Sequence, residues 1–362
     1  MKIEGQFTDF VLKMRAWSKE LGFSDLRIAD IRLDEAEKRL QQCLAQDFHV
    51  EMHYMAAHGM KRCRPDELLP GTVRVVSVRM DYLPDTKALS QAKAGVHHAD
   101  PLAARISLYA RGRDYHKVLR SRLQKLADKM QDAIGPFSYR VFADSAPVME
   151  VAFAGKAGMG WQGKNNLLLC RDGGSFFFLG EMLVDLPLPV DSGEDDHCGN
   201  CTRCMQACPT GALVAPYRLD ARRCVSYLTI EFKGSIPVTL RPLMGNRIYG
   251  CDDCQLCCPW NRFAKVSDVP DFAVRHDMDR ATLLELFGWT ETEFLQKMQG
   301  SPVRRIGYVC WCRNIAVALG NALREVSDAT EISRIVAALR DKRQTVSDMV
   351  DEHIDWALAQ KP

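Results

Sequence analysis

The chain has 362 residues, of which 47% are hydrophobic and 26% are charged, and its formal net charge at pH 7 is +2. This composition is typical of a soluble globular protein with two or three domains, and the small net charge excludes a uniformly basic surface. No run of 18 apolar residues occurs, and the opening stretch MKIEGQFTDF has neither an apolar segment nor a twin arginine. We therefore expect a cytoplasmic protein without a membrane span.

The first half of the chain carries helical and strand-like patterns in irregular alternation. Asp114 is positioned to cap the start of the longest predicted helix, and Gly135 to end it. Because no regular strand–helix–strand repeat occurs, we favour an α+β fold over a doubly wound parallel sheet. In chain order, the patterns predict a helix over 8–21, a strand over 73–83, a helix over 114–135, a strand over 139–147 and a hairpin over 166–186 with its turn at 172–174.

Composition changes twice further along the chain. The stretch LPLPVDSGEDD, residues 186–196, is rich in proline and then acidic, which is typical of a domain boundary. After about residue 265 the patterns become helical, in short pairs that suggest a HEAT-like arrangement. We therefore predict three domains, over residues 1–187, 188–265 and 266–362.

The first cysteine-rich run has the spacing of a ferredoxin. It reads CGNCTRCMQACPTG over residues 198–211, which is C-x2-C-x2-C-x3-C-P, in a chain with fourteen cysteines. Three cysteines at two-residue intervals surround one face of a [4Fe-4S] cluster, and the fourth ligates the other cluster in two-cluster ferredoxins. Zinc sites usually pair two distant C-x2-C segments, so the spacing favours iron–sulfur clusters over zinc.

The second run, CDDCQLCCPWN over residues 251–261, lacks the middle cysteine of such a motif. If Cys258, followed by proline, ends the motif, one ligand must come from elsewhere, and Cys224 between the runs is the candidate. Cys257 then binds no cluster; the competing interpretation makes Cys257 a ligand and leaves Cys258 unused. The other five cysteines are scattered, as small buried side chains often are. The predicted ligands are Cys198, Cys201, Cys204 and Cys258 for cluster one, and Cys208, Cys224, Cys251 and Cys254 for cluster two.

Two stretches before residue 187 carry candidate substrate chemistry. Asp144 ends a predicted strand, ahead of a glycine-rich segment whose backbone can approach a flat ligand closely. Tyr115 and His116 follow Asp114 at a helix start and offer a phenol and an imidazole. The simpler interpretations are a turn or cap for Asp144, and an N-cap with two surface aromatic residues for the other stretch. The residues alone leave these alternatives open.

Six segments together resemble the epoxyqueuosine reductase family over nearly the whole chain. They are YARGRDYHKVL, ADSAPVMEVAFAGKAGMGWQGKNNLLL, CGNCTRCMQACPTGAL, RRCVSYLTIE, YGCDDCQLCCPWN and RRIGYVCWCRNIAVALGNA. The resemblance implies a nitroreductase-like domain that binds a corrinoid, a ferredoxin-like domain with two [4Fe-4S] clusters, and a HEAT-like helical domain. It also implies reduction of epoxyqueuosine to queuosine at the wobble position of tRNA. Cys257 departs from the family pattern, which commonly has an apolar residue there, and this agrees with its exclusion from the ligands.

The resemblance further implies a site. Asp144 matches the family's proton donor to the opening epoxide, and burial beside a corrin would raise its pKa and keep it protonated near neutral pH. Tyr115 and His116 would line the same pocket. The D-x-H-x-x-G pattern of cobalt-ligating histidines begins at Asp114 but has Leu119 in place of glycine, so we expect base-off cobalamin without a protein imidazole on cobalt. The implied cobalamin contacts are Arg62, Ser107, Asp144, Gly163, Lys164, Asn165 and Tyr227.

The resemblance also implies partners. Arg304, Arg305 and Arg313 in the helical region are the candidate contacts to tRNA phosphates. The implied reductant is a flavodoxin or a ferredoxin, and we expect a monomer. Two alternatives stay open: a corrinoid reductive dehalogenase, which usually has a twin-arginine signal, and a non-enzymatic electron carrier, which leaves the first 187 residues unexplained.

Overall fold

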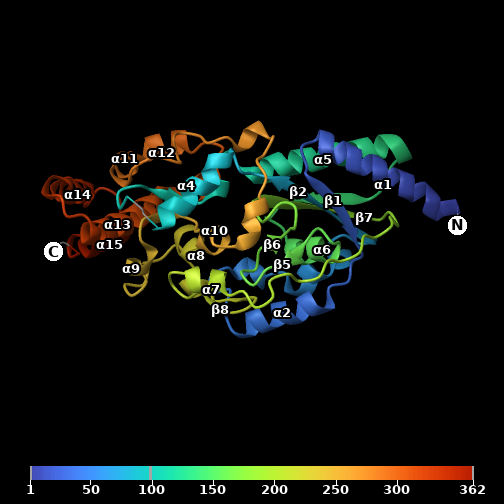
Figure 1. Cartoon of the computed structure of the whole chain (residues 1–362), viewed down its shortest axis with the longest axis horizontal. Coiled ribbons are helices and arrows are strands. Elements are labelled where there is room, and N and C mark those ends of the chain that lie inside the picture. The colour runs from blue at the N-terminus through green and yellow to red at the C-terminus, as the bar shows by residue number, and fades with distance from the viewer. Residues whose placement is uncertain (1, 98–99, 361–362) are drawn as a thin grey trace.

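The computed structural model describes residues 2–97 and 100–360 (Figure 1). The molecule is elongated, with a sheet near the N-terminal end, short cysteine-bearing helices in the middle and a group of helices at the C-terminal end. Within the described residues, no helix is long and apolar enough to cross a membrane.

Four strands form one sheet in the order β1-β2-β7-β4, and each neighbouring pair is antiparallel. The two central strands are eight residues long and are almost entirely buried. The predicted strand over 73–83 is confirmed as β2. The antiparallel pairing agrees with the predicted α+β fold. The strands span Asp25–Ala29 (β1), Arg74–Asp81 (β2), Tyr139–Phe142 (β4) and Phe177–Val184 (β7).

Helices cover both faces of the sheet. On one face, Leu123 of α5 packs with Val78 and other side chains of the sheet. On the opposite face, Phe153 of α6 packs with Val75 and with apolar side chains of α2. The first face is covered by α1 (Lys2–Glu20) and α5 (Tyr115–Ile134), and the second by α2 (Asp34–Ala45) and α6 (Glu150–Lys156).

The long helix α5 begins and ends where the sequence predicts. The carboxylate of Asp114 accepts a hydrogen bond from the backbone N–H of His116 at 3.1 Å, as an N-cap does. Gly135, with φ of 84°, ends the helix. This cap fixes Tyr115 and His116 in the first turn, where they lie beside the segment that follows β4.

The predicted hairpin over 166–186 is wrong. Its turn does form, because Cys170 and Gly174 exchange backbone hydrogen bonds of 2.8 and 3.0 Å. The strands on either side then separate: β6 (Leu168–Leu169) pairs with β5 (Trp161–Gln162), and β7 pairs with β2 and β4. The run FFLGEMLV is buried on both faces, so β7 occupies the centre of a sheet and takes a partner on each edge.

Short elements connect the sheet to the C-terminal helices. The parallel pair of β3 and β10 joins segments about 140 residues apart in the chain, and α7 packs against α10. These elements are α3 (Pro65–Leu68), α4 (Thr86–His97), β3 (Arg105–Ile106), α7 (Arg203–Ala207), β8 (Leu213–Ala215), β9 (Arg218–Leu219), α8 (Val225–Ile230), α9 (Arg241–Met244), β10 (Arg247–Tyr249) and α10 (Asp253–Leu256).

The C-terminal helices surround α13, whose residues 310–323 are all buried. Their core continues without a break into the middle of the chain, because Ile106 and Ile248 belong to the same apolar cluster as Trp311. The domain boundaries at 187 and 265 stay a prediction. The helices are α11 (Leu283–Gly288), α12 (Glu291–Lys297), α13 (Gly307–Glu325), α14 (Ala329–Lys342) and α15 (Asp348–Leu358).

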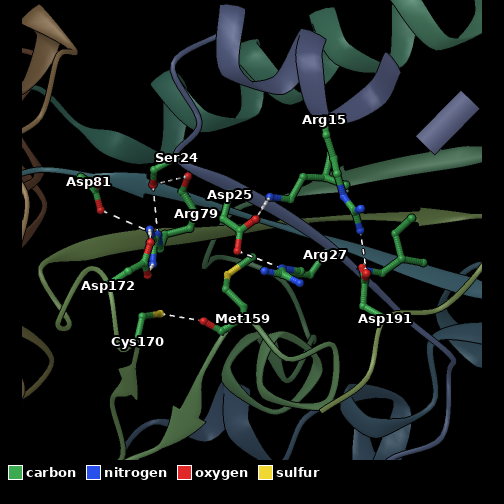
Figure 2. Close-up of polar contacts among 12 residues, drawn as sticks. Arg15, Ser24, Asp25, Arg27, Arg79, Asp81, Met159, Cys170, Asp172 and Asp191 are labelled. Atoms are coloured by element: carbon green, nitrogen blue, oxygen red, sulfur yellow. Dashed lines mark hydrogen bonds and ion pairs between the residues drawn. The ribbon is translucent and has the colours of Figure 1, made fainter. Parts of the chain in front are cut away.

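A buried arginine ties the sheet to the loop that precedes β7 (Figure 2). The side chain of Arg79 on β2 is 1% exposed, and its guanidinium donates to Ser24 Oγ and to Asp172, both at 3.1 Å. The same group lies 3.9 Å from the buried carboxylate of Asp81 and over the ring of Phe177. Two carboxylates, a hydroxyl group and an aromatic ring therefore surround the positive charge of Arg79.

We expect Arg79→Ala to lower the free energy of unfolding by about 3 to 5 kcal/mol, because it leaves Asp81 buried without its counter-charge. Arg27→Ala is the matched control. Arg27 and Asp25 both lie on β1, the strand next to β2, and their ion pair is partly exposed, so it contributes about 1 kcal/mol or less. Urea unfolding followed by circular dichroism measures both. Equal costs for the two variants would contradict a structural role for Arg79.

Candidate active site and metal centres

The eight predicted cysteine ligands surround two cavities. The cavity of the first set has a volume of about 70 Å³, and that of the second set about 350 Å³. Within the described part of the chain, no three His, Cys, Asp or Glu side chains converge as the ligands of a single metal ion do. Cys198, Cys201, Cys204 and Cys258 line the first cavity, and Cys208, Cys224, Cys251 and Cys254 line the second.

The two runs exchange their last cysteines, as the sequence predicts. Cys208 ends the short helix α7, and Cys258 precedes a 3-10 helix over Pro259–Phe263. Each stands in extended backbone before a proline and lines the cavity of the other run's set. Cys257 lines neither cavity, and its thiol lies 3.5 Å from the carbonyl oxygen of Cys254. The grouping matches the predicted ligand sets, and metal ligation itself stays a prediction.

The second cavity extends beyond its cysteines into a largely aromatic space. Ser107 and Asn165, two of the implied cobalamin contacts, line it. Ser107 Oγ donates to the Asp252 carboxylate, and Asn165 donates to the Cys254 carbonyl oxygen at 3.1 Å. A single cavity therefore connects the second cysteine set with the aromatic side chains Tyr82, Tyr109, Tyr115, Phe177 and Phe178.

Asp144 lies beside this space and is held by two neighbours on α5. The Tyr115 hydroxyl donates to Asp144 Oδ2, and His116 Nε2 lies 3.2 Å from the same oxygen. The other ring nitrogen of His116 lies 2.8 Å from Asp114 Oδ1, so the imidazole bridges two carboxyl groups. About half of the Asp144 side-chain surface, 49%, is open to solvent. The turn or cap interpretation of Asp144 alone does not account for these contacts.

The electrostatics of this group favour a proton on His116 over one on Asp144. Burial alone would raise the pKa of Asp144, but hydrogen bonds from His116 and Tyr115, with the charges of His116 and Arg305, outweigh it and hold the pKa below its ordinary value. Burial lowers the pKa of His116, yet its bonds to Asp114 and Asp144 raise it overall to about 9. Within the chain itself, a basic neighbour therefore opposes the desolvation on which the expectation for Asp144 rests, and protonation of Asp144 beside a corrin stays a prediction.

The other implied cobalamin contacts are more dispersed. Lys164 lines the first cavity, where its ammonium donates to the carbonyl oxygens of Gly199 and Cys201. Gly163 has no room for a side chain, because a Cβ there would lie 2.7 Å from Asn165 Oδ1. Of the remaining implied contacts, Arg62 Nε and the hydroxyl of Tyr227 are buried and have no hydrogen-bond partner within the residues described.

The three arginines proposed to contact tRNA differ in their exposure to solvent. Arg304 is exposed, and Arg305 is partly exposed, pairs with Glu231 and is close enough to lower the pKa of Asp144. Arg313 is 0% exposed and donates to the carbonyl oxygens of Leu228, Phe232 and Gly234. The prediction of a tRNA contact at Arg313 is wrong, because a side chain that anchors α13 to the segment after α8 cannot reach a phosphate.

Sequence reasoning missed two carboxyl groups next to Asp144. Glu150 Oε1 accepts the backbone N–H of Asp144 at 2.6 Å, and the fully buried Glu181 is its neighbour. A signal was present for Glu181, since it is the one charged residue within the apolar strand run FFLGEMLV.

Comparison with known proteins agrees with this geometry. Residues 197–261 match a family model described as "4Fe-4S double cluster binding domain", and residues 62–145 match one described as "Epoxyqueuosine reductase QueG, DUF1730". An epoxyqueuosine reductase of Burkholderia pseudomallei is 55% identical over 98% of this chain and 93% of its own length. The two-cluster segment, joined to a cavity that bears ionisable side chains, defines an iron–sulfur oxidoreductase. The chain belongs to the epoxyqueuosine reductase family, so the resemblance read from the sequence is confirmed.

Solved structures of the family share the fold. A crystal structure of an epoxyqueuosine reductase with an epoxyqueuosine-modified tRNA-Tyr stem loop superposes with a TM-score of 0.79, at 25% identity over 98% of this chain and 99% of that one. The enzyme of Bacillus subtilis, with a catalytic aspartate loop swung out of the active site, gives a TM-score of 0.77 at 25% identity over 98% and 100%.

Proposed function

We propose that this chain reduces epoxyqueuosine in tRNA to queuosine at the cavity between Asp144 and the second cysteine set. The observation that carries the proposal is the continuity of one cavity from Cys208, Cys224 and their partners to Tyr115, the residue that holds Asp144. Converting an epoxide to an alkene takes up two electrons and two protons and releases one water. The cavity has an electron source on one side and an acid–base group on the other.

Electrons enter, in this proposal, through the first cluster. Cys201 is the most exposed of its four ligands, whereas Cys224 and its partners line the deeper cavity. A flavodoxin or ferredoxin would reduce cluster one, and cluster two would pass single electrons onward. The protein would do so as a monomer in the cytoplasm.

We propose that cobalamin binds between the clusters and the substrate, with part of it in the larger cavity. When bound, it supplies a strongly nucleophilic metal centre that accepts single electrons. Ser107 and Asn165 line the space, and the partnerless Arg62 Nε and Tyr227 hydroxyl are buried donors suited to its polar substituents. Both ring nitrogens of His116 already face carboxyl groups, which supports the base-off state without a protein imidazole on cobalt.

Asp144, His116 and Tyr115 would supply the proton to the opening ring. Asp144 is half exposed to solvent and bonded to Tyr115, which lines the cavity, while the His116 imidazolium, held between two carboxylates, would store the proton at neutral pH. By analogy with the Bacillus subtilis enzyme, we propose that the segment carrying Asp144 also has an outward position. We further propose that the three regions of the chain are the nitroreductase-like, ferredoxin-like and HEAT-like domains.

The function is tested by nucleoside analysis of an epoxyqueuosine-bearing stem-loop RNA after incubation with the chain, iron–sulfur clusters, cobalamin and a reductant. The expected product is queuosine, and a strain lacking the gene should accumulate epoxyqueuosine in its tRNA. Unchanged epoxyqueuosine with all components present would overturn the proposal.

The tRNA would contact Arg304 and Arg305. We expect Arg304→Glu with Arg305→Glu to weaken stem-loop binding and to reduce the slope of log affinity against log salt by about one for each phosphate that the variant no longer neutralises, because fewer counterions are released. Arg340→Glu, on the exposed side of α14, is the matched control. Binding isotherms at several salt concentrations measure both variants, and equal slopes would exclude these arginines from the interface.

A further inference from the structure

Glu181 is a carboxyl group in the centre of the sheet. It lies on β7 opposite Ser77 of β2 and Phe142 of β4, and it is 0% exposed. Apart from its carboxyl neighbour Glu150, neither of its oxygens has a hydrogen-bond partner within the described part of the chain. Burying an ionised carboxylate without donors costs several kcal/mol, so the folded protein favours the protonated form. In agreement, burial and the charge of Glu150 raise the pKa of Glu181 well above its ordinary value.

Glu150 connects this buried carboxyl group to Asp144. Its side chain is the hydrogen-bonding neighbour of Glu181, and its Oε1 accepts the Asp144 backbone N–H at 2.6 Å. Two carboxyl groups can hydrogen-bond to each other only when one of them carries a proton, because two carboxylates offer acceptors alone. Burial, with the charge of Asp144, raises the pKa of Glu150 to about 7.

The bonded amide belongs to a strained residue. Asp144 has a φ of 58°, in the left-handed region that residues other than glycine adopt less readily. Glu150 therefore bonds the backbone at the point where the chain departs from its preferred conformation. Glu181, which pairs in register with Phe142 of β4, is the other carboxyl neighbour of Glu150.

We propose that Glu150 and Glu181 are positioning residues, a carboxyl pair that shares one proton and thereby holds the Asp144 segment against the active-site cavity. This inference rests on the proposed function for its catalytic consequence, though not for its structural one. When the shared proton is lost, Glu150 and Glu181 repel each other and the negative Asp144, and the segment is released. The other groups that face the pair are Tyr115 and His116 from α5 and Arg62 from the 3-10 helix Gly59–Cys63.

Four variants separate this role from simple packing. Glu150→Leu removes the acceptor of the Asp144 N–H, whereas Glu150→Gln keeps a carbonyl oxygen in its place. Glu181→Gln supplies a permanent donor that does not titrate. Met182→Leu, the next residue on β7 with its side chain on the opposite face of the sheet, is the packing control.

The primary measurement is amide hydrogen exchange of the segment around Asp144 between pH 6 and 10, corrected for intrinsic exchange rates, on the cluster-loaded chain. In the wild-type chain, protection should fall as the pH rises and the shared proton is lost. Glu181→Gln should retain protection across the range, and Glu150→Leu should lack it throughout. Glu150→Gln should restore most of it.

The second measurement is the single-turnover conversion of epoxyqueuosine stem-loop RNA. We expect Glu150→Leu to be slowed about 10- to 100-fold with unchanged iron content, the usual consequence of a misplaced catalytic group, and Glu150→Gln to recover. Wild-type protection in Glu150→Leu, or an unaltered pH dependence of protection in Glu181→Gln, would overturn the inference. Because exchange needs no substrate, failure of the proposed function would appear separately, as absent conversion in the wild-type chain.

Discussion

Asp144→Asn is expected to convert epoxyqueuosine about 100- to 10,000-fold more slowly than the wild-type chain, the usual contribution of a positioned acid–base group. The amide is nearly isosteric, so the fold and both clusters should be retained. Asparagine can still accept the hydrogen bond from Tyr115, but it cannot carry a proton between His116 and the opening ring. The loss should therefore appear in the chemical step rather than in tRNA binding.

The pH dependence identifies the proton store. The pKa of His116 is raised to about 9, so its imidazolium is present at neutral pH and is lost as the pH rises through about 9. The wild-type rate should fall over the same interval. Asp144→Asn removes one of the two carboxylates that raise the pKa of His116, and Asp114 remains. The pKa of His116 should therefore be lower in this variant, so its residual rate should begin to fall at a lower pH than the wild-type rate.

Single-turnover conversion with prereduced enzyme is the measurement, because it removes electron supply from the comparison. Asp132→Asn, an exposed carboxylate on α5, is the matched control and should react at the wild-type rate. If Asp144→Asn also reacts at that rate, Asp144 is a structural residue and Tyr115 becomes the next candidate donor.

Local signals in the sequence predicted much of the site. The caps of α5 and the run of β2 depend on neighbouring residues, so Asp114, Gly135 and the strand over 73–83 were found where the structure has them. The cysteine spacing likewise predicted two sets of four cysteines, and each set lines one cavity. The second run has one cysteine too few for a cluster motif, and counting the missing ligand was enough to select Cys224 as the candidate.

Features that depend on distant partners were not predicted. Arg313 has the appearance of a surface charge until the carbonyl oxygens around residues 228–234 converge on it. The hairpin failed for the same reason, since β7 takes partners from β2 and β4. The expected rise in the pKa of Asp144 considered burial without His116, whose approach depends on how α5 packs beside β4.

Cys224→Ala is expected to reduce the iron content from about eight to about four atoms per chain and to abolish turnover with an external reductant. Cys224 caps α8 and lines the cavity with Cys208, Cys251 and Cys254, so its loss leaves three ligands for cluster two. Cluster one has an independent set and should persist. Electrons would then stop at cluster one, because the deeper cavity that joins the clusters to the substrate holds the second set.

Cys257→Ala is the matched control, one residue from a predicted ligand. Its thiol lies 3.5 Å from the Cys254 carbonyl oxygen and outside both cavity linings, so we expect about eight iron atoms and wild-type turnover. Cys258→Ala, in contrast, should lose cluster one and retain cluster two. Iron analysis with electron paramagnetic resonance of the reduced proteins distinguishes the variants. If Cys257→Ala loses a cluster and Cys258→Ala does not, the crossed assignment is wrong, and the second run binds its metal through the cysteine that family relatives commonly replace with an apolar residue.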